Sequence, residues 1–215
     1  MRNILATFLI FALLVVLGPA SVHAGTVILN FDSVALSPGA CTDGTAYLNS
    51  FGITFSSPVA TAFPAICNGT GTAVTAVSLP NWFGVNVPPP LNNTPLSYTL
   101  TFGTALDSLS FWSANLASNI TFPTWNATAF DGAVPVSTVT HPGGFGIPAK
   151  KFTLNGPGIT SLTVSSSQTG FSTNGTTTDD LTIVTPAVPE PSSLLLLGTG
   201  LLGLWPLARR RIRSV

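Results

Sequence analysis

An alternation of apolar and polar residues places the strongest constraint on the fold of this chain. In SYTLTF, residues 97–102, the apolar Tyr98, Leu100 and Phe102 alternate with serine and threonine, and SLTVS, residues 161–165, alternates in the same way. A period of two is typical of a strand that buries one face. Helical periodicity is absent between residues 25 and 188, so we expect an all-β domain there.

Eight further segments predict short strands, for a total of about ten. They are residues 26–31, 52–56, 73–78, 107–114, 125–130, 134–140, 150–154 and 180–184. The frequent glycines and prolines of the chain supply the turns that many short strands need. This pattern favours a single antiparallel β-sandwich, jelly-roll-like in topology, over residues 25–188.

Charged residues are rare in the expected domain. Six aspartates and two lysines lie between residues 25 and 188, with no arginine and no glutamate, which gives a net charge of −4. Nucleic acid is therefore not an expected partner, because phosphate binding requires a basic surface. Serine, threonine, asparagine and glycine must provide most of the polar surface.

No sequence motif indicates an enzyme. The chain lacks GxSxG, HExxH and a phosphate-binding loop, and His141 lies in THPGGFG, where we expect an exposed imidazole in a turn. A hydrolase that uses two aspartates stays open, because the distance between carboxylates is not visible in a sequence. We expect a protein without catalytic activity.

Cys41 and Cys67 are the only cysteines, and both lie in segments with the composition of loops. In an exported chain such a pair predicts a disulfide, with two unpaired thiols as the alternative. A zinc site is disfavoured, because His141 is the only histidine of the expected domain and the spacing of a zinc finger is absent.

Aspartates at the two ends of the domain predict a calcium site. Asp32 follows the first expected strand, whereas Asp179 and Asp180 begin the last one. These strand ends often lie side by side in a jelly roll, so that Asp32, Asp180 and nearby carbonyls can hold Ca²⁺. The arrangement resembles the structural calcium site of carbohydrate-binding jelly rolls. The alternative is that these aspartates cap turns.

Three tryptophans, Trp82, Trp112 and Trp125, are candidates for a carbohydrate-binding surface, because sugar rings stack on exposed aromatic faces. Trp82 is the best candidate for exposure, since Pro and Asn around it indicate a loop. The alternative is that the tryptophans pack in the core.

The first 24 residues have the pattern of a signal peptide. Arg2 precedes an apolar run over residues 4–18, and the VHA triplet, residues 22–24, has the small residues of a cleavage site. An uncleaved membrane anchor is the alternative.

The C-terminal segment predicts a short transmembrane helix. Residues 192–208 are apolar, small or hydroxylic, and as a helix they would extend over about 25 Å. A basic cluster follows at once and is expected to stay in the cytoplasm, which leaves the domain outside the inner membrane. The cluster consists of Arg209, Arg210, Arg211 and Arg213.

The residues before this helix complete a recognisable arrangement. Pro189, Glu190 and Pro191 form an extended, accessible segment, followed by the Leu- and Gly-rich run and the arginines. Residues 188–215 thus resemble the PEP-CTERM sorting signal of exported bacterial proteins. The resemblance implies processing at residues 189–191 by an exosortase-type membrane protease-transferase, and delivery to the outer surface or to extracellular polysaccharide.

These observations predict an exported, non-catalytic protein of the cell surface or extracellular matrix with a carbohydrate-binding role. Two alternatives remain: a secreted polysaccharide hydrolase with an aspartate pair, and a purely structural component of the matrix.

Overall fold

The computed structural model describes residues 24–72, 74–86, 97–113, 115–116, 121–122, 124–166 and 177–187. Within the chain, residues 25–186 form one compact unit. The expected signal peptide, apart from Ala24, lies outside the described residues, as do the expected transmembrane helix, residues 192–208, and the basic cluster. In the described part, no helix is long and apolar enough to cross a membrane.

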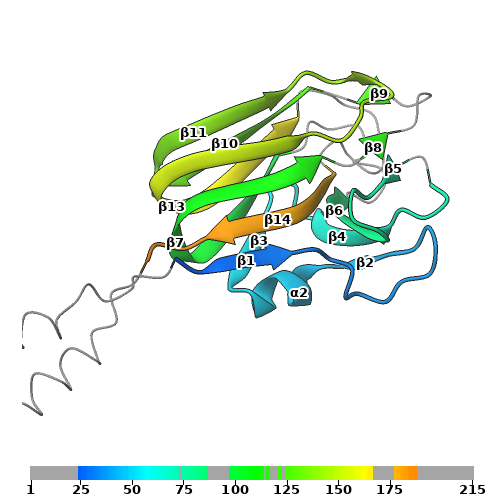
Figure 1. The fold of residues 1–215 in the computed structure, drawn as a ribbon, viewed down its shortest axis with the longest axis horizontal. Coiled ribbons are helices and arrows are strands. Elements are labelled where there is room, and N and C mark those ends of the chain that lie inside the picture. Colours follow the sequence, from blue (N-terminus) through cyan, green and yellow to red (C-terminus); the bar gives the residue numbers. More distant parts are fainter. Residues whose placement is uncertain are drawn as a thin grey trace, which may run out of the picture. The chain divides into compact units, whose positions relative to one another are not determined.

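Strands make up most of the unit, and their pairings are antiparallel (Figure 1). The first six are β1 (Thr26–Leu29), β2 (Cys41–Asp43), β3 (Ile53–Ser56), β4 (Phe63–Asn68), β5 (Val74–Thr75) and β6 (Asn81–Asn86). The next four are β7 (Ser97–Ser113), β8 (Asn115–Leu116), β9 (Thr121–Phe122) and β10 (Trp125–Asp131). The last four are β11 (Val134–His141), β12 (Gly144–Phe145), β13 (Lys151–Ser166) and β14 (Thr178–Val184). The predicted antiparallel β architecture is therefore confirmed.

The main sheet has the strand order β11, β10, β13, β7, β14, β6, β4 and β2, while β1 also pairs with β14 and β3 with β7. Residues 97–101 of β7 pair with residues 161–165 of β13, and residues 99–102 pair with β3. Residues 108–112 pair instead with residues 151–155 of β13 and with β14. β7 and β13 thus take part in both halves of the sheet.

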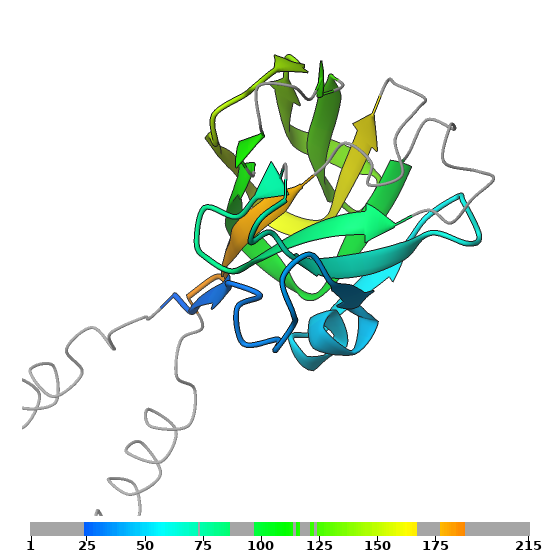
Figure 2. The same cartoon turned by 90° about the vertical axis from the view of Figure 1, so that its right-hand side faces the viewer.

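Bends in these two strands fold the sheet over on itself (Figure 2). Register shifts on β13 fall between Asn155 and Ile159 and between Ile159 and Ser161, and β-bulges of this kind bend a strand. We call β3, β10, β11 and the paired segments 97–101 and 161–165 the first layer. The second layer contains β1, β14, β6, β4, β2 and the segments 108–112 and 151–155.

The apolar core lies between the two layers. Phe83 of β6 meets Tyr98 of β7 in an edge-on contact with 6.3 Å between ring centroids. Phe111 of the second layer contacts Trp125 of the first at 5.9 Å. In β7, β10 and β13, alternate residues are largely buried in this core, as the period of two predicts.

The number and length of the strands differ from the expectation. The segments 97–102 and 107–114 were expected as separate strands, but residues 97–113 form the continuous β7. Residues 151–154 and 161–165 likewise both belong to β13. Glycine and asparagine between them signalled turns, whereas the chain only bends there. Gly158, with φ of +75°, marks such a bend.

Sequence reasoning missed the short strands β2, β8, β9 and β12, the longer strands β4 and β6, and a short helix. Residues of β4 and β6 are buried on both faces, so these strands show no alternation of polar and apolar residues. The helix, α2 (Thr45–Ser50), has six residues and buries only Leu48, which is too little to produce a helical period.

Both ends of the unit lie together. β1 pairs with β14, with Leu29 opposite Leu181, and the two strands run side by side in Figure 1. The backbone N–H of Thr185 donates to the carbonyl of Gly25 at 2.9 Å. The adjacency of the first and last strands, on which the calcium prediction was based, is therefore present.

Candidate functional site

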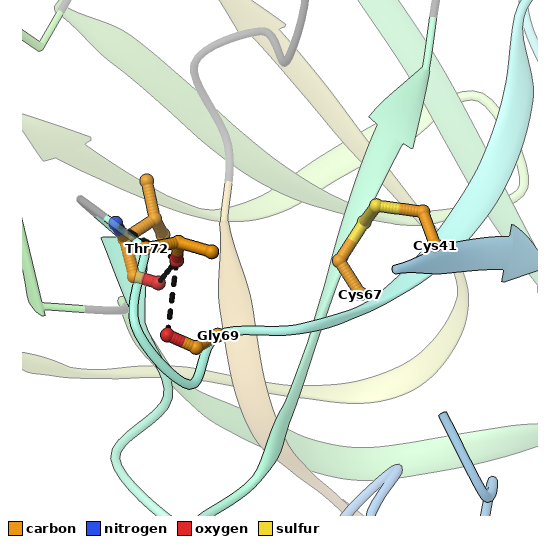
Figure 3. The surroundings of a disulfide bond; sticks show 5 residues. Cys41, Cys67, Gly69 and Thr72 are labelled. Atoms are coloured by element: carbon orange, nitrogen blue, oxygen red, sulfur yellow. Dashed lines mark hydrogen bonds between the residues drawn. A yellow bond between two sulfur atoms is a disulfide. The ribbon is translucent and has the colours of Figure 1, made fainter. Parts of the chain in front are cut away.

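The predicted disulfide is confirmed. Cys41 of β2 and Cys67 of β4 stand opposite each other in the antiparallel pair, and their sulfurs are 2.04 Å apart (Figure 3). The chain leaves β4 through a turn in which the N–H and hydroxyl of Thr72 both donate to the carbonyl of Gly69, at 3.1 and 3.0 Å. The bond fixes the edge strand β2 to the sheet.

The exposure predicted for Trp82 is wrong. Trp82 lies in β6, not in a loop, and it is 6% exposed. Its side chain packs with Ala65, Cys67 and Ala76 in a small second core. The segment after β4 thus covers the outer face of β4 and β6. The Pro and Asn residues next to Trp82 indicate a loop and do not predict this burial.

Trp125 is also a core residue, and so is His141, which was expected to be exposed. The two rings stack with 5.2 Å between centroids, and Trp125 meets Phe152 edge-on at 5.2 Å. Nδ1 of His141 accepts a hydrogen bond from the N–H of Gly143 at 3.2 Å. Burial lowers the pKa of His141, and the charge of Lys150 lowers it further. These contacts make His141 a structural residue of the core.

Of the three tryptophans, only Trp112 reaches the surface, where it is half-buried. It lies in the second half of β7, with Lys151 of β13 on one side and Asp179 of β14 on the other. Sequence reasoning favoured Trp82 over Trp112 for exposure, but the distinction depends on which strand faces which layer.

Asp179 is a fully buried carboxylate that holds a loop against β14. Its Oδ2 accepts the backbone N–H groups of Val77 and Ser78, both at 2.7 Å, and Oδ1 accepts the N–H of Asp180 at 2.8 Å. The hydroxyl of Ser78 lies 3.1 Å from Oδ1. The carboxylate therefore acts as a cap for the loop between β5 and β6.

This environment raises the pKa of Asp179 to about 6. Loss of hydration on burial is the main cause, and the neighbouring charge of Asp180 adds to it, while the hydrogen bonds from Ser78 and Asp180 oppose it. The carboxyl group of Asp179 therefore gains or loses its proton at a mildly acidic pH.

Asp32 and Asp180 bind the same loop from two sides. Oδ1 of Asp32 accepts the N–H of Asn81 at 3.0 Å, and Oδ1 of Asp180 accepts the hydroxyl of Ser78 at 3.0 Å. The amide of Asn81 donates back to the carbonyls of Phe31 and Val34, at 3.0 and 2.7 Å. Asp32, Asp179 and Asp180 thus all accept hydrogen bonds from residues 77–81, which is the arrangement expected of aspartates that cap a turn.

The described residues contain no cluster of three or more His, Cys, Asp or Glu side chains that could hold a metal ion. Calcium binding by Asp32 and Asp180 with backbone carbonyls stays a prediction. Melting temperatures measured with EDTA and with added calcium test it, and equal values in the two conditions would contradict it.

Sequence reasoning missed Ser78 and Asn81 as partners of these aspartates. Both lie in the segment SLPN, which indicates a turn but not what the turn touches. Ser78 is 101 residues from Asp179 along the chain, so no local signal could have found the contact.

The comparison with protein families identifies the C-terminal segment. Residues 187–213 match the family model of the PEP-CTERM protein-sorting motif, which confirms the resemblance seen in residues 188–215. A motif of this kind indicates an exported protein of the cell envelope or surface. No curated protein sequence matches the chain.

Several solved structures are similar to the chain, at low identity and with TM-scores below 0.5. The K1 cleaved adhesin domain of Lys-gingipain from Porphyromonas gingivalis W83 has 12% identity and a TM-score of 0.44, with 74% of this chain and 97% of that chain covered. The family 11 carbohydrate-binding module of Clostridium thermocellum has 11% identity and a TM-score of 0.34, with coverage of 75% and 96%. The carbohydrate-binding module CBM27-1 of Caldicellulosiruptor saccharolyticus has 11% identity and a TM-score of 0.34, with coverage of 74% and 96%.

Proposed function

We propose that this chain is a non-catalytic surface or matrix protein that binds polysaccharide once exported. An exosortase-type enzyme sorts it through its C-terminal segment. The match of residues 187–213 to the sorting motif carries the export and sorting in this proposal. Processing at Pro189, Glu190 and Pro191 would follow insertion of residues 192–208 in the inner membrane, with Arg209, Arg210, Arg211 and Arg213 on the cytoplasmic side.

Two features of the unit support an extracellular destination. The Cys41–Cys67 disulfide fits an oxidising compartment, where such bonds form and persist. The polar surface depends on hydroxyl and amide groups, since residues 25–188 contain only eight charged side chains.

The contacts of Asp179 argue against its use as one of a catalytic pair of aspartates. Asp179 and Asp180 are neighbours in the chain, but the carboxylate of Asp179 is fully buried and accepts three backbone N–H groups. A general acid or base needs access to its substrate. This carboxylate is enclosed by the protein itself.

The test is the intact mass of the protein recovered from a host with an exosortase-type system. We expect a mass that lacks residues 1–24 and the residues that follow the Pro-Glu-Pro triplet, Pro189 to Pro191. Replacing Pro189, Glu190 and Pro191 together by alanine should leave the C-terminal segment attached and the protein in the inner-membrane fraction.

A matched control replaces Thr185 and Pro186 by alanine, which lie just before the matched segment 187–213, and it should be processed normally. Equal processing of the triplet variant and the control would contradict the sorting proposal. Release of sugar from a polysaccharide would favour the hydrolase, and retention in the matrix without any polysaccharide binding would favour a purely structural component.

A further inference from the structure

The outward face of the first layer carries short hydroxyl side chains in aligned rows. In the central row, Ser56 of β3, Thr99 of β7, Thr163 of β13, Thr128 of β10 and Thr138 of β11 stand opposite one another across five strands. Each is exposed or half-buried, whereas residues next to them in sequence, such as Leu100, Val164 and Ala127, are buried.

Two more rows flank the central one. On one side the row consists of Ser97, Ser165, Asn126 and Thr140. On the other side it consists of Thr54, Thr101, Ser161 and Phe130. We call these three rows the hydroxyl face.

Hydrogen bonds within the rows hold several of these side chains in place. The hydroxyls of Thr99 and Thr163 are 2.9 Å apart, and those of Thr128 and Thr138 are 3.1 Å apart. The hydroxyl of Thr140 donates to Oδ1 of Asn126 at 2.7 Å. Because threonine is also stiff at χ1, these hydroxyls lose little conformational freedom when a ligand binds.

The rows form a regular two-dimensional array. Neighbouring strands are about 4.8 Å apart, and alternate residues along one strand are about 6.7 Å apart. Each hydroxyl can donate one hydrogen bond and accept two, so a pair that shares one bond keeps further capacity for a ligand.

No charged side chain belongs to the hydroxyl face. The charged residues of the described strands lie at the end of β10, in the second layer or at the bend of β7, as Asp131, Lys151 and Asp107 do. A neutral face cannot offset the charge of a phosphate or uronate polymer. An apolar partner would leave the hydroxyls without hydrogen bonds, which is unfavourable.

A neutral sugar polymer has the complementary chemistry. It presents hydroxyls that both donate and accept along a repeating chain, and it carries no charge that requires a counterpart. Phe130, half-buried at the end of one row, adds a ring on which a sugar can stack.

We propose that the hydroxyl face is the binding site for a neutral polysaccharide. This inference rests on the polysaccharide binding that is part of the proposed function, and it specifies the surface and the class of polymer.

The test uses the exported protein, produced from its full-length gene, and measures binding to cellulose, mannan and xylan as neutral polymers and to alginate as an anionic one. The double variant Thr128→Val with Thr163→Val removes two central hydroxyls without changing side-chain shape. We expect its affinity for a bound neutral polymer to fall about tenfold. A second variant, Thr101→Lys, places a charge on an exposed position of the same face and should weaken the binding as well.

The matched control is Thr153→Val with Thr182→Val. Both threonines lie in the second layer, beside Ser110, and one of them shares β13 with Thr163. We expect the control to bind like the unmodified protein, and melting temperatures to show that all variants are folded.

Each other outcome overturns the inference in a distinguishable way. Binding to a neutral polymer that is unchanged in both face variants would place the site elsewhere, and polysaccharide binding as a function would stand. Binding to alginate alone would exclude the neutral class. Self-association that the face variants abolish would make the face an interface between copies. Absence of binding to any polymer would remove polysaccharide binding itself.

Discussion

Replacing Asp179 by alanine should remove the cap that holds the loop between β5 and β6 on the sheet. The carboxylate accepts three backbone N–H groups, from Val77, Ser78 and Asp180, at 2.7, 2.7 and 2.8 Å. A lost hydrogen bond of this type costs about 1 to 2 kcal/mol when water replaces it only in part. Part of this loss is offset, because the variant no longer buries a carboxylate whose pKa is raised to about 6. We expect a net loss of about 2 to 4 kcal/mol in the free energy of unfolding.

Urea unfolding at pH 7 measures this loss, with Asp43→Ala as the matched control. Asp43 is exposed and accepts the N–H and hydroxyl of Thr45, at 2.8 and 2.6 Å, so its removal should cost less than about 1 kcal/mol. If the two variants lose the same amount, the buried cap does not stabilise the unit as argued.

The pH dependence of stability gives an independent check through Asp179→Asn. The pKa of Asp179 is higher in the folded than in the unfolded chain, because the ordinary value of 3.8 rises to about 6. The folded state therefore holds this proton more tightly, and its stabilising contribution is complete below about pH 4 and lost as the pH rises through about 6. We expect the unmodified protein to lose stability relative to the asparagine variant between pH 4 and 7. A constant difference between the two proteins over this range would refute the assigned environment.

Three further predictions concern the core and the disulfide. Replacing Cys41 and Cys67 together by serine should lower the free energy of unfolding by about 3.5 kcal/mol, as expected for a closed loop with a sequence separation of 26, and chemical denaturation measures this value. Gly84→Ala should cost about 1 to 3 kcal/mol in the same assay, because the new Cβ would lie 2.6 Å from Cζ3 of Trp82; an unchanged midpoint would show that the ring moves freely. His141→Phe should reduce the loss of stability that occurs as the pH falls below about 6.5. The reason is that the pKa of His141 is lowered in the folded state, so the unfolded chain takes up this proton first. Melting temperatures that fall equally with pH in the variant and the unmodified protein would contradict this prediction.

The sequence was sufficient where the signal is local. The alternation in residues 97–102 and 161–165 predicted strands with one buried face, since that pattern depends only on successive side chains. The disulfide between Cys41 and Cys67 needed no geometry, because only one intramolecular pairing is possible. The sorting motif is a contiguous arrangement within residues 187–213.

The positions of Trp82 and His141 could not be predicted in this way. Both lie beside residues that indicate turns, yet Trp82 packs against β4 and the segment after it, and His141 packs against Trp125 and Phe152. Burial depends on what covers a side chain, and strands covered on both faces show no periodic pattern.

By itself, then, the sequence determined the strand period, the cysteine pair and the C-terminal sorting motif, because each is a property of adjacent residues or of their number. Only the tertiary structure decided that β7 and β13 bend between two layers, that Asp179 caps a loop 101 residues away, and that threonines from five strands align in rows. The physical reason is that strand register and long-range contacts depend on the free energy of the whole packed unit, which no local segment contains.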